Sequence, residues 1–206
     1  MGLLSTPLGR LAGGCAVTAA GVALLKGGKL SSLPSSLPTS TGGAFASLLS
    51  TSVFVGASVW TTFFAGILMF TNLPKTTFGD LQAKLFPVYF GLQTATSAAA
   101  LALTATGRAG GSSSSARPRA VAAAVALAFS LLNLAVLEPL TTAAMYHRRA
   151  AQAEGSKFPE NEKKKASGRF GMLHGLSSLA NLFALGAGVT VLWFSAEGMV
   201  AAGGGK

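Results

Sequence analysis

The segment FGMLHGLSSLAN (170–181) carries polar side chains at the start of a long apolar run. Four of them follow the spacing i, i+3, i+4, i+7, namely His174, Ser177, Ser178 and Asn181. On an α-helix this spacing places all four groups on one face. If the run crosses a bilayer, that face should turn inward, where imidazole, hydroxyl and amide groups find partners. The segment therefore predicts an inward-facing polar stripe, which is either a functional site or a packing device.

Glu138 is a second candidate, because apolar sequence bounds this acidic residue. Pro139 follows it, lacks a backbone donor and tends to kink a helix. The hydroxyls of Thr141 and Thr142 could satisfy carbonyls that such a kink frees. His174 and Glu138 are expected at similar depth in the membrane. A hydrogen bond or ion pair between them would keep either charge from lying bare in a medium of low polarity.

Three further polar residues are expected at the same membrane face, because the ends of the neighbouring spans meet there: Asn72, Gln82 and Tyr89. The alternative to a functional cluster is a structural one. Ser, Thr and Asn in membrane helices often serve only to hold helices together, at about 0.6 kcal/mol each. Glu138 could also lie at the level of the lipid headgroups. Both interpretations stay open at this point.

Four apolar stretches are long enough to position these residues in a membrane, since a helical span takes about 20 residues. They predict transmembrane helices near 44–71, 82–106, 120–146 and 170–196. The runs do not alternate apolar with polar residues, as transmembrane β-strands do. Charged residues make up 11% of the chain, against about a quarter in soluble domains. The sequence therefore predicts an all-α integral membrane protein, a four-helix transmembrane bundle with a short apolar N-terminal leader or extra helix.

The chain divides into three regions: a leader with a Ser/Pro-rich linker (1–43), a four-span domain (44–197) and a flexible tail (198–206). The apolar part of the leader, 11–25, is short for a span. It fits a signal sequence or anchor, an organellar transit peptide, or a short membrane helix. An endomembrane or the plasma membrane is favoured, and the acid-free leader is also compatible with a mitochondrial or plastid membrane. Cys15 is the single cysteine, which excludes an intrachain disulfide.

The basic residues act as topology signals. With the leader set aside, Lys and Arg concentrate in the loop 147–169 and in the short loop after the first span. The positive-inside tendency then places these loops in the cytoplasm or its organellar equivalent. The net charge is +10, but no basic face interleaved with aromatic residues accompanies it, so nucleic acid is not an expected partner.

Three stretches together resemble the transmembrane protein 205-like family over about residues 50–195: LPKTTFGDLQAKLFPVYF, LEPLTTAAMYHRR and FGMLHGLSSLANL. The resemblance is carried by their elements FP-x-YF (86–90), EP-x-TT (138–142) and HG-x-SS-x-x-N (174–181). It implies a four-helix membrane domain, usually in secretory-pathway or surface membranes, with suggested involvement in the export of metal-containing drugs. It implies no catalytic residues. The Ser/Pro-rich leader and the Gly/Ser linker depart from the family's pattern.

Two functions fit these observations. In a transport or export factor, the polar cluster would line a cavity or bind a cation, and the thioethers of Met145 and Met172 would favour soft metals. Four spans without an internal repeat are poorly suited to alternating access, so such a transporter would need a second copy. In a structural or assembly subunit of a larger membrane complex, the cluster would only fix packing.

Small residues that allow close helix approach support the second function: Gly56, Ala57, Gly66, Gly91, Gly186 and Gly188. An intramembrane enzyme using His174 and Glu138 ranks last, because no nucleophile, metal triad or phosphate loop accompanies them. We therefore expect no enzyme activity, no cofactor and no resident metal. The expected partners are the lipid bilayer and either further copies of the chain or a larger membrane complex.

Overall fold

The computed structural model describes residues 41–111 and 113–203, so the predicted leader lies outside the described residues except for 41–43. The described part is helical and contains no strand. The first long helix runs without a break through α2 (Thr41–Val59), η3 (Trp60–Ala65) and α3 (Gly66–Asn72). The next helix is α4 (Lys75–Ala105). Two more long helices follow: α5 (Ser113–Leu132), η4 (Asn133–Leu137) and α6 (Glu138–Gln152) as one, then α7 (Glu160–Gly203).

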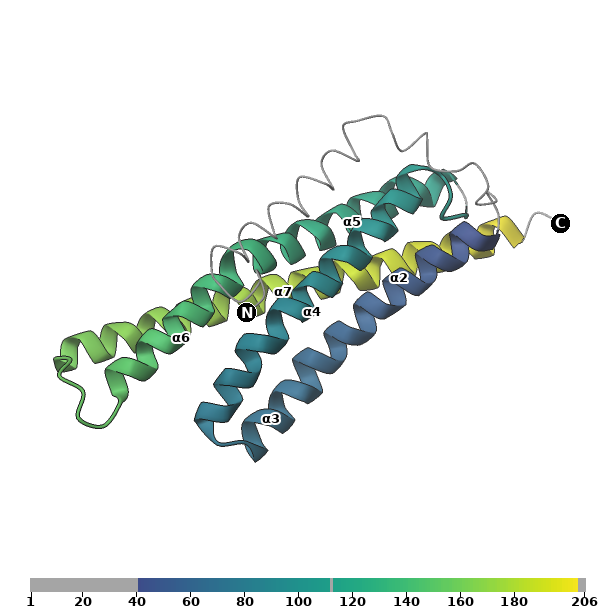
Figure 1. Ribbon diagram of the computed structural model, residues 1–206. Coiled ribbons are helices and arrows are strands. Elements are labelled where there is room, and N and C mark those ends of the chain that lie inside the picture. The colour runs from purple at the N-terminus through teal and green to yellow at the C-terminus, as the bar shows by residue number, and fades with distance from the viewer. Residues whose placement is uncertain (1–40, 112, 204–206) are drawn as a thin grey trace, which may run out of the picture.

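The four long helices run alternately up and down (Figure 1). Helix α2 packs on α4 and α7, and α5 packs on the same two helices, so the four form a ring of neighbours. They converge at the end that holds the start of α2, the turn 106–111 and the C-terminal end of α7 (Figure 1). At the opposite end two hairpins extend separately, one formed by α3 and α4 and the other by α6 and α7 (Figure 1). The arrangement is consistent with the predicted four-helix bundle.

Three of the helices are long and apolar enough to cross a membrane: Thr41–Asn72, Ser114–Gln152 and Glu160–Ala201. They make this an integral membrane protein, as the composition predicted. The predicted second span, 82–106, coincides with α4, which is not one of these three. Helix α4 is less apolar because it carries Asp80 and Lys84 in its first turns and a polar face around Gln93.

The helices extend beyond the predicted spans at their connections. Helix α6 continues to Gln152 and α7 begins at Glu160, so the predicted loop 147–169 shrinks to 153–159. Two ion pairs spaced i, i+3 stabilise the start of α7. Lys163 Nζ lies 2.7 Å from Glu160 Oε1, and Lys165 Nζ lies 2.9 Å from Glu162 Oε1. At its other end α7 extends to Gly203, into the segment predicted as a flexible tail, of which 204–206 lie outside the described residues.

The core between the helices is built largely from small side chains. Phe54 packs against Ala126 and Ala184, and a second cluster joins Ala122, Ala123 and Val191. Gly188 allows the first cluster to close, because a Cβ there would lie 2.6 Å from Cε1 of Phe54. The other glycines expected at helix contacts do not lie against a neighbouring helix. A Cβ on Gly56, Gly91 or Gly186 would meet open space, and one on Gly66 would meet only its own helix.

Two long helices each contain one π-helical segment near the middle. The backbone N–H of Gly66 bonds to Thr61 O, and that of Glu138 bonds to Asn133 O, five residues back in each case. Pro139 explains the second segment, because it lacks an N–H and its ring crowds the carbonyl four residues earlier. A π-turn widens the helix there and lets it continue.

Candidate functional site

A network of buried polar side chains joins three of the four long helices at the level of η3. We call it the polar network, and it consists of Ser58, Thr62, Tyr89, Gln93 and Asn181. Tyr89 Oη donates to Asn181 Oδ1 at 2.8 Å, and Asn181 Nδ2 donates to Thr62 Oγ1 at 2.8 Å. Gln93 Nε2 lies 2.7 Å from Ser58 Oγ, 2.8 Å from Tyr89 Oη and 3.1 Å from Asn181 Oδ1. Ser58 and Gln93 are 0% exposed, Tyr89 is 4% and Asn181 is 7% exposed, so the network is almost closed to the outside.

A second polar contact, the Asn133–Ser177 pair, joins the long helix formed by α5, η4 and α6 to α7. Ser177 Oγ donates to Asn133 Oδ1 at 2.8 Å, and Asn133 Nδ2 donates to Ser177 O at 3.3 Å. Asn133 is the first residue of the π-helical segment η4, and Thr62 of the polar network lies within the other π-helical segment, η3. Both π-helical segments therefore present a polar side chain to α7. π-turns are frequent at functional sites, because they reposition a side chain within an otherwise regular helix.

The amides differ from the other buried polar groups in where their hydrogen bonds go. Most buried hydroxyls bond to the carbonyl four residues back in their own helix, as Ser130 Oγ does to Ala126 O at 2.8 Å. Such a group is satisfied wherever its helix lies. Gln93, Asn133 and Asn181 bond instead to side chains or carbonyls of other helices. Like the hydroxyl of Tyr89, these amides depend on the helices being in their present places.

One acceptor of the network has no hydrogen-bond partner: Gln93 Oε1, which is fully buried. Its neighbour Thr94 also holds a buried hydroxyl without a partner. A buried polar atom left unpaired costs about 1–3 kcal/mol. The amide of Gln93 thus provides an unused acceptor in the centre of the bundle.

The structure gives Glu138 and His174 different surroundings, although the sequence predicts a bond between them. Glu138 is buried, and its Oε1 accepts from Thr142 Oγ1 at 2.8 Å. His174 is exposed and stacks on Phe170, with ring centroids 5.6 Å apart. Among the described residues no hydrogen bond or ion pair joins the two. The contacts of Asn133 with Ser177 and of Arg148 with Phe170, at 4.1 Å, place Glu138 near the level of His174. Glu138 is nevertheless buried, whereas His174 is exposed.

Only half of the polar stripe that the sequence predicts on the inward face of α7 is turned inward. Asn181 is buried and Ser177 is half-buried, whereas Ser178 and His174 are exposed. The buried positions of α7 recur at 173, 180, 184, 188, 191 and 195. At 3.6 residues per turn the centre of that stripe passes close to Ser177 and leaves positions 174 and 178 at its edge.

The remaining predicted residues lie away from the polar network, apart from Tyr89. Asn72 is exposed, and its Nδ2 donates to Leu68 O at 2.8 Å in its own helix. Gln82 is half-buried on α4. Thr141 Oγ1 donates to Leu137 O at 2.6 Å, directly beside the proline.

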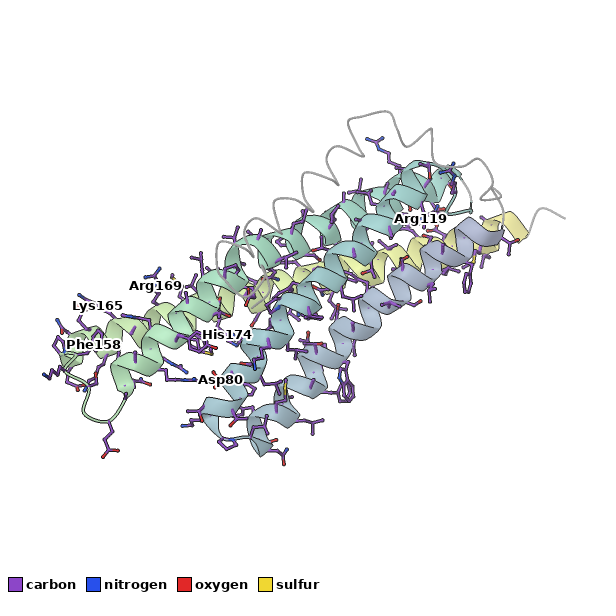
Figure 2. All side chains as sticks on the ribbon, in the orientation of Figure 1. Asp80, Arg119, Phe158, Lys165, Arg169 and His174 are labelled. Atoms are coloured by element: carbon purple, nitrogen blue, oxygen red, sulfur yellow. The ribbon has the colours of Figure 1, made fainter. Side chains whose placement is uncertain are left out.

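A separate ion pair fastens the start of α4 to the end of α6. Arg149 Nη1 lies 2.8 Å from Asp80 Oδ1, and its Nη2 donates to Thr76 O at 2.8 Å. Figure 2 shows Asp80 toward the end of the molecule where the two hairpins extend, and Arg119 at the opposite end. The pair belongs to the charged end of the molecule and not to the polar network.

Sequence reasoning missed Gln93, Asn133, Ser58 and Thr62. Two of these carried a readable signal, because Gln93 and Asn133 are the single amides inside the apolar runs 85–106 and 121–137. An amide in a membrane helix is costly unless it is bonded. Ser58 and Thr62 carried no such signal in the sequence, because hydroxyl residues are frequent along the first span and most bond within their own helix.

The network can donate and accept hydrogen bonds, but it holds no carboxylate, imidazole or thiol. Among the described residues no group of three or more His, Cys, Asp or Glu could hold a metal ion. Of the two thioethers considered for soft metals, Met145 is buried against the start of α4 and Met172 is exposed. The arrangement therefore has the chemistry of a packing device or of a site for a neutral or weakly bound polar group.

Comparison with solved structures gave no match. Residues 49–150 match the family model of a domain of unknown function, DUF4149. The matched region covers most of α2 and continues through α6, and includes Ser58, Thr62, Tyr89, Gln93 and Asn133. It ends before α7, which supplies Asn181 and Ser177. About half of the chain is thus similar to this domain, and the polar network extends across the boundary of the similarity.

Proposed function

We propose that this protein is a four-span membrane protein of the transmembrane protein 205-like kind that acts as a structural or assembly subunit of a membrane complex, without enzyme activity of its own. The observation that carries the proposal is the polar network. Its amides are turned toward one another and are nearly closed to the outside. Side chains that hold each other in this way determine which helices pack together.

The polar network also supports α4 as a membrane-spanning helix, in addition to the three apolar ones. Tyr89 and Gln93 on α4 reach Ser58 on α2 and Asn181 on α7. These two partners lie within helices that are long and apolar enough to cross the membrane. A helix bonded to them at mid-length must lie at the same depth. Helix α4 can be less apolar than its neighbours because its polar face is turned inward.

The outer surface of the first long helix fits a role in assembly. None of the residues of η3 and α3 is buried. Large apolar side chains are exposed there, among them Trp60, Phe63, Phe64 and Phe70. Lipid can cover such a surface, and so can a helix of another protein. A subunit that joins a larger complex would offer this face.

A transport or export factor is the second candidate, and one observation favours it. Gln93 Oε1 is a buried acceptor without a hydrogen bond. An acceptor of this kind could bind a passing cation or a polar substrate if the helices opened. The suggested export of metal-containing drugs in the resembling family gives this candidate a measurable substrate class.

Replacing the interhelical bonds with apolar side chains separates the two candidates. The single variant Asn181→Leu should destabilise the protein by about 1–3 kcal/mol, because Tyr89 Oη and Gln93 Nε2 lose an acceptor. The triple variant Tyr89→Phe, Gln93→Leu and Asn181→Leu removes all three groups and should recover much of that loss. Thr96→Val is the matched control on α4, because its hydroxyl bonds only within its own helix.

Three readouts are taken from the full-length protein in cells: thermal stability in detergent, the size of the native complex after mild solubilisation, and cellular platinum content after exposure to a platinum drug. For a structural subunit, the triple variant recovers stability but loses the native complex, because the bonds that specify the packing are gone, and platinum content stays unchanged. A stable triple variant with an intact complex and altered platinum content would favour transport. A wild-type protein that is monomeric in cross-linked native membranes would contradict the assembly role.

A further inference from the structure

A groove on the outer face between α5 and α7 has the features of a lipid site. It encloses about 660 Å³. Its lining is apolar except at one end, where Arg117 projects into it, and in Thr190, whose hydroxyl bonds to Gly186 O at 2.8 Å in its own helix. Its lining combines small residues, among them Ala122, Gly186 and Ala187, with larger side chains such as Phe183 and Phe194. We propose that this groove binds an anionic phospholipid, with one acyl chain along the groove and the headgroup phosphate at Arg117.

The length of the groove matches one leaflet. Its lining runs from Arg117 to Val125 on α5 and from Leu182 to Phe194 on α7. At 1.5 Å per residue these stretches span about 12 Å and about 18 Å. Half of a hydrocarbon core of about 30 Å is about 15 Å. An acyl chain lying in the groove would therefore reach from the headgroup level to about the middle of the bilayer.

The position of Arg117 places a cation at the headgroup level. Arg117 is exposed, and no hydrogen bond or ion pair joins it to another described residue. Trp193 precedes a groove residue on α7 and is 70% exposed. Tryptophan prefers the boundary between lipid and water. Both residues therefore lie toward the end of the groove at which we place the headgroup phosphate.

The charges around this end favour an anionic headgroup. Arg108 and Arg119 lie at the same end of the bundle, and Arg119 Nη2 donates to Gly110 O at 2.7 Å. Glu197 on α7 is the opposing acid in this region of the described chain. Cations outnumber acids here, and basic pockets between membrane helices bind acidic lipid headgroups. Arg117 is the cation that the groove itself contains.

Brominated lipids test the proposal, because bromine quenches tryptophan fluorescence at contact range. Full-length protein carrying Trp60→Phe keeps Trp193 as its only tryptophan and is reconstituted in vesicles containing brominated phosphatidylglycerol or brominated phosphatidylcholine. We expect Trp193 to favour the anionic lipid by about fivefold in relative binding constant. Arg117→Gln should abolish this preference, and Gly186→Leu should reduce quenching by both lipids by filling the groove. Arg169→Gln, an exposed arginine at the other end of the molecule, is the matched control.

Equal quenching by the two lipids, or a preference that survives Arg117→Gln, would overturn the proposal. Cross-linking distinguishes other occupants, because Cys15 is the single native cysteine. Full-length protein carrying Val121→Cys is oxidised in membranes. An intrachain bond between positions 15 and 121 would show that the leader occupies the groove, and a dimer linked through position 121 of both copies would show a second copy there. Either result would contradict a lipid occupant, and the expected result is neither bond.

Discussion

At the scale of single residues, burial of a polar group has two different consequences in this protein. A hydroxyl such as Ser130 bonds to its own helix and does not constrain its neighbours. An amide such as Asn181 bonds to two other helices and is satisfied in one arrangement only. Hydrogen bonds between membrane helices contribute about 0.6 kcal/mol on average. Their value here lies in specifying the packing, since the apolar surfaces alone would permit many alternatives.

The buried carboxyl of Glu138 should couple to Thr142 and not to His174. In double-mutant cycles, Glu138→Gln combined with Thr142→Val should give a coupling energy of about 0.5–1.5 kcal/mol, because one hydrogen bond at 2.8 Å is removed. Glu138→Gln combined with His174→Leu should be additive within about 0.5 kcal/mol. Thermal unfolding in detergent measures both cycles. Strong coupling between Glu138 and His174 would contradict this prediction and would support the bond that the sequence predicts between them.

How far the site could be predicted depends on the kind of residue. The i, i+3, i+4, i+7 spacing pointed to Asn181 and Ser177, which bond to other helices, because spacing on a helix fixes which residues share a face. It could not say which edge of that face is buried, so His174 and Ser178 were expected inside. Gln93 and Asn133 were recognisable as lone amides in apolar runs, whereas Thr62 gained its role from a π-turn that has no simple sequence pattern. Three of the four long helices followed directly from apolar length, and α4 is not one of these three.

At the scale of secondary structure elements, the approach of α2 to α7 depends on the absence of one side chain. Gly188→Ala should destabilise the protein by about 1–3 kcal/mol, because the new Cβ would lie 2.6 Å from the ring of Phe54. Phe54→Leu in the same chain should restore part of the loss by vacating that space. Gly175→Ala is the control on α7, since a Cβ there meets open space and alanine favours the helix. Equal effects of the two alanines would contradict the predicted clash.

The ion pair between α4 and α6 should contribute little to global stability. Arg149 and Asp80 have side chains that are 35% and 48% exposed, so water and salt screen their attraction. We expect Arg149→Gln to cost less than about 1 kcal/mol, and the cost should fall as salt is raised. The local effect should be larger, with faster hydrogen exchange in the first turns of α4. A large salt-independent loss would mean that the bond of Arg149 to Thr76 O dominates.

At the scale of the whole molecule, the helices are longer than a bilayer is thick. Helix α7 has 44 residues, which at 1.5 Å each gives about 66 Å, against a hydrocarbon core of about 30 Å. The excess carries the charge: Lys165 and Arg169 lie along the hairpin formed by α6 and α7 (Figure 2). This hairpin should therefore project from the membrane, with the converging ends of the helices at the other surface.

Cysteine labelling tests that placement in full-length protein carrying Cys15→Ser. Thr106→Cys lies in the turn between α4 and α5, and Glu154→Cys lies in the turn between α6 and α7. Because the helices alternate in direction, we expect the two positions to react with a membrane-impermeant maleimide from opposite sides of sealed vesicles. Leu179→Cys, exposed at mid-length on α7, should react only after detergent is added. Since Lys and Arg concentrate around 147–169, position 154 should face the cytoplasm or its organellar equivalent. Labelling of positions 106 and 154 from the same side would show that the one helix between them, α5 through α6, does not cross the membrane.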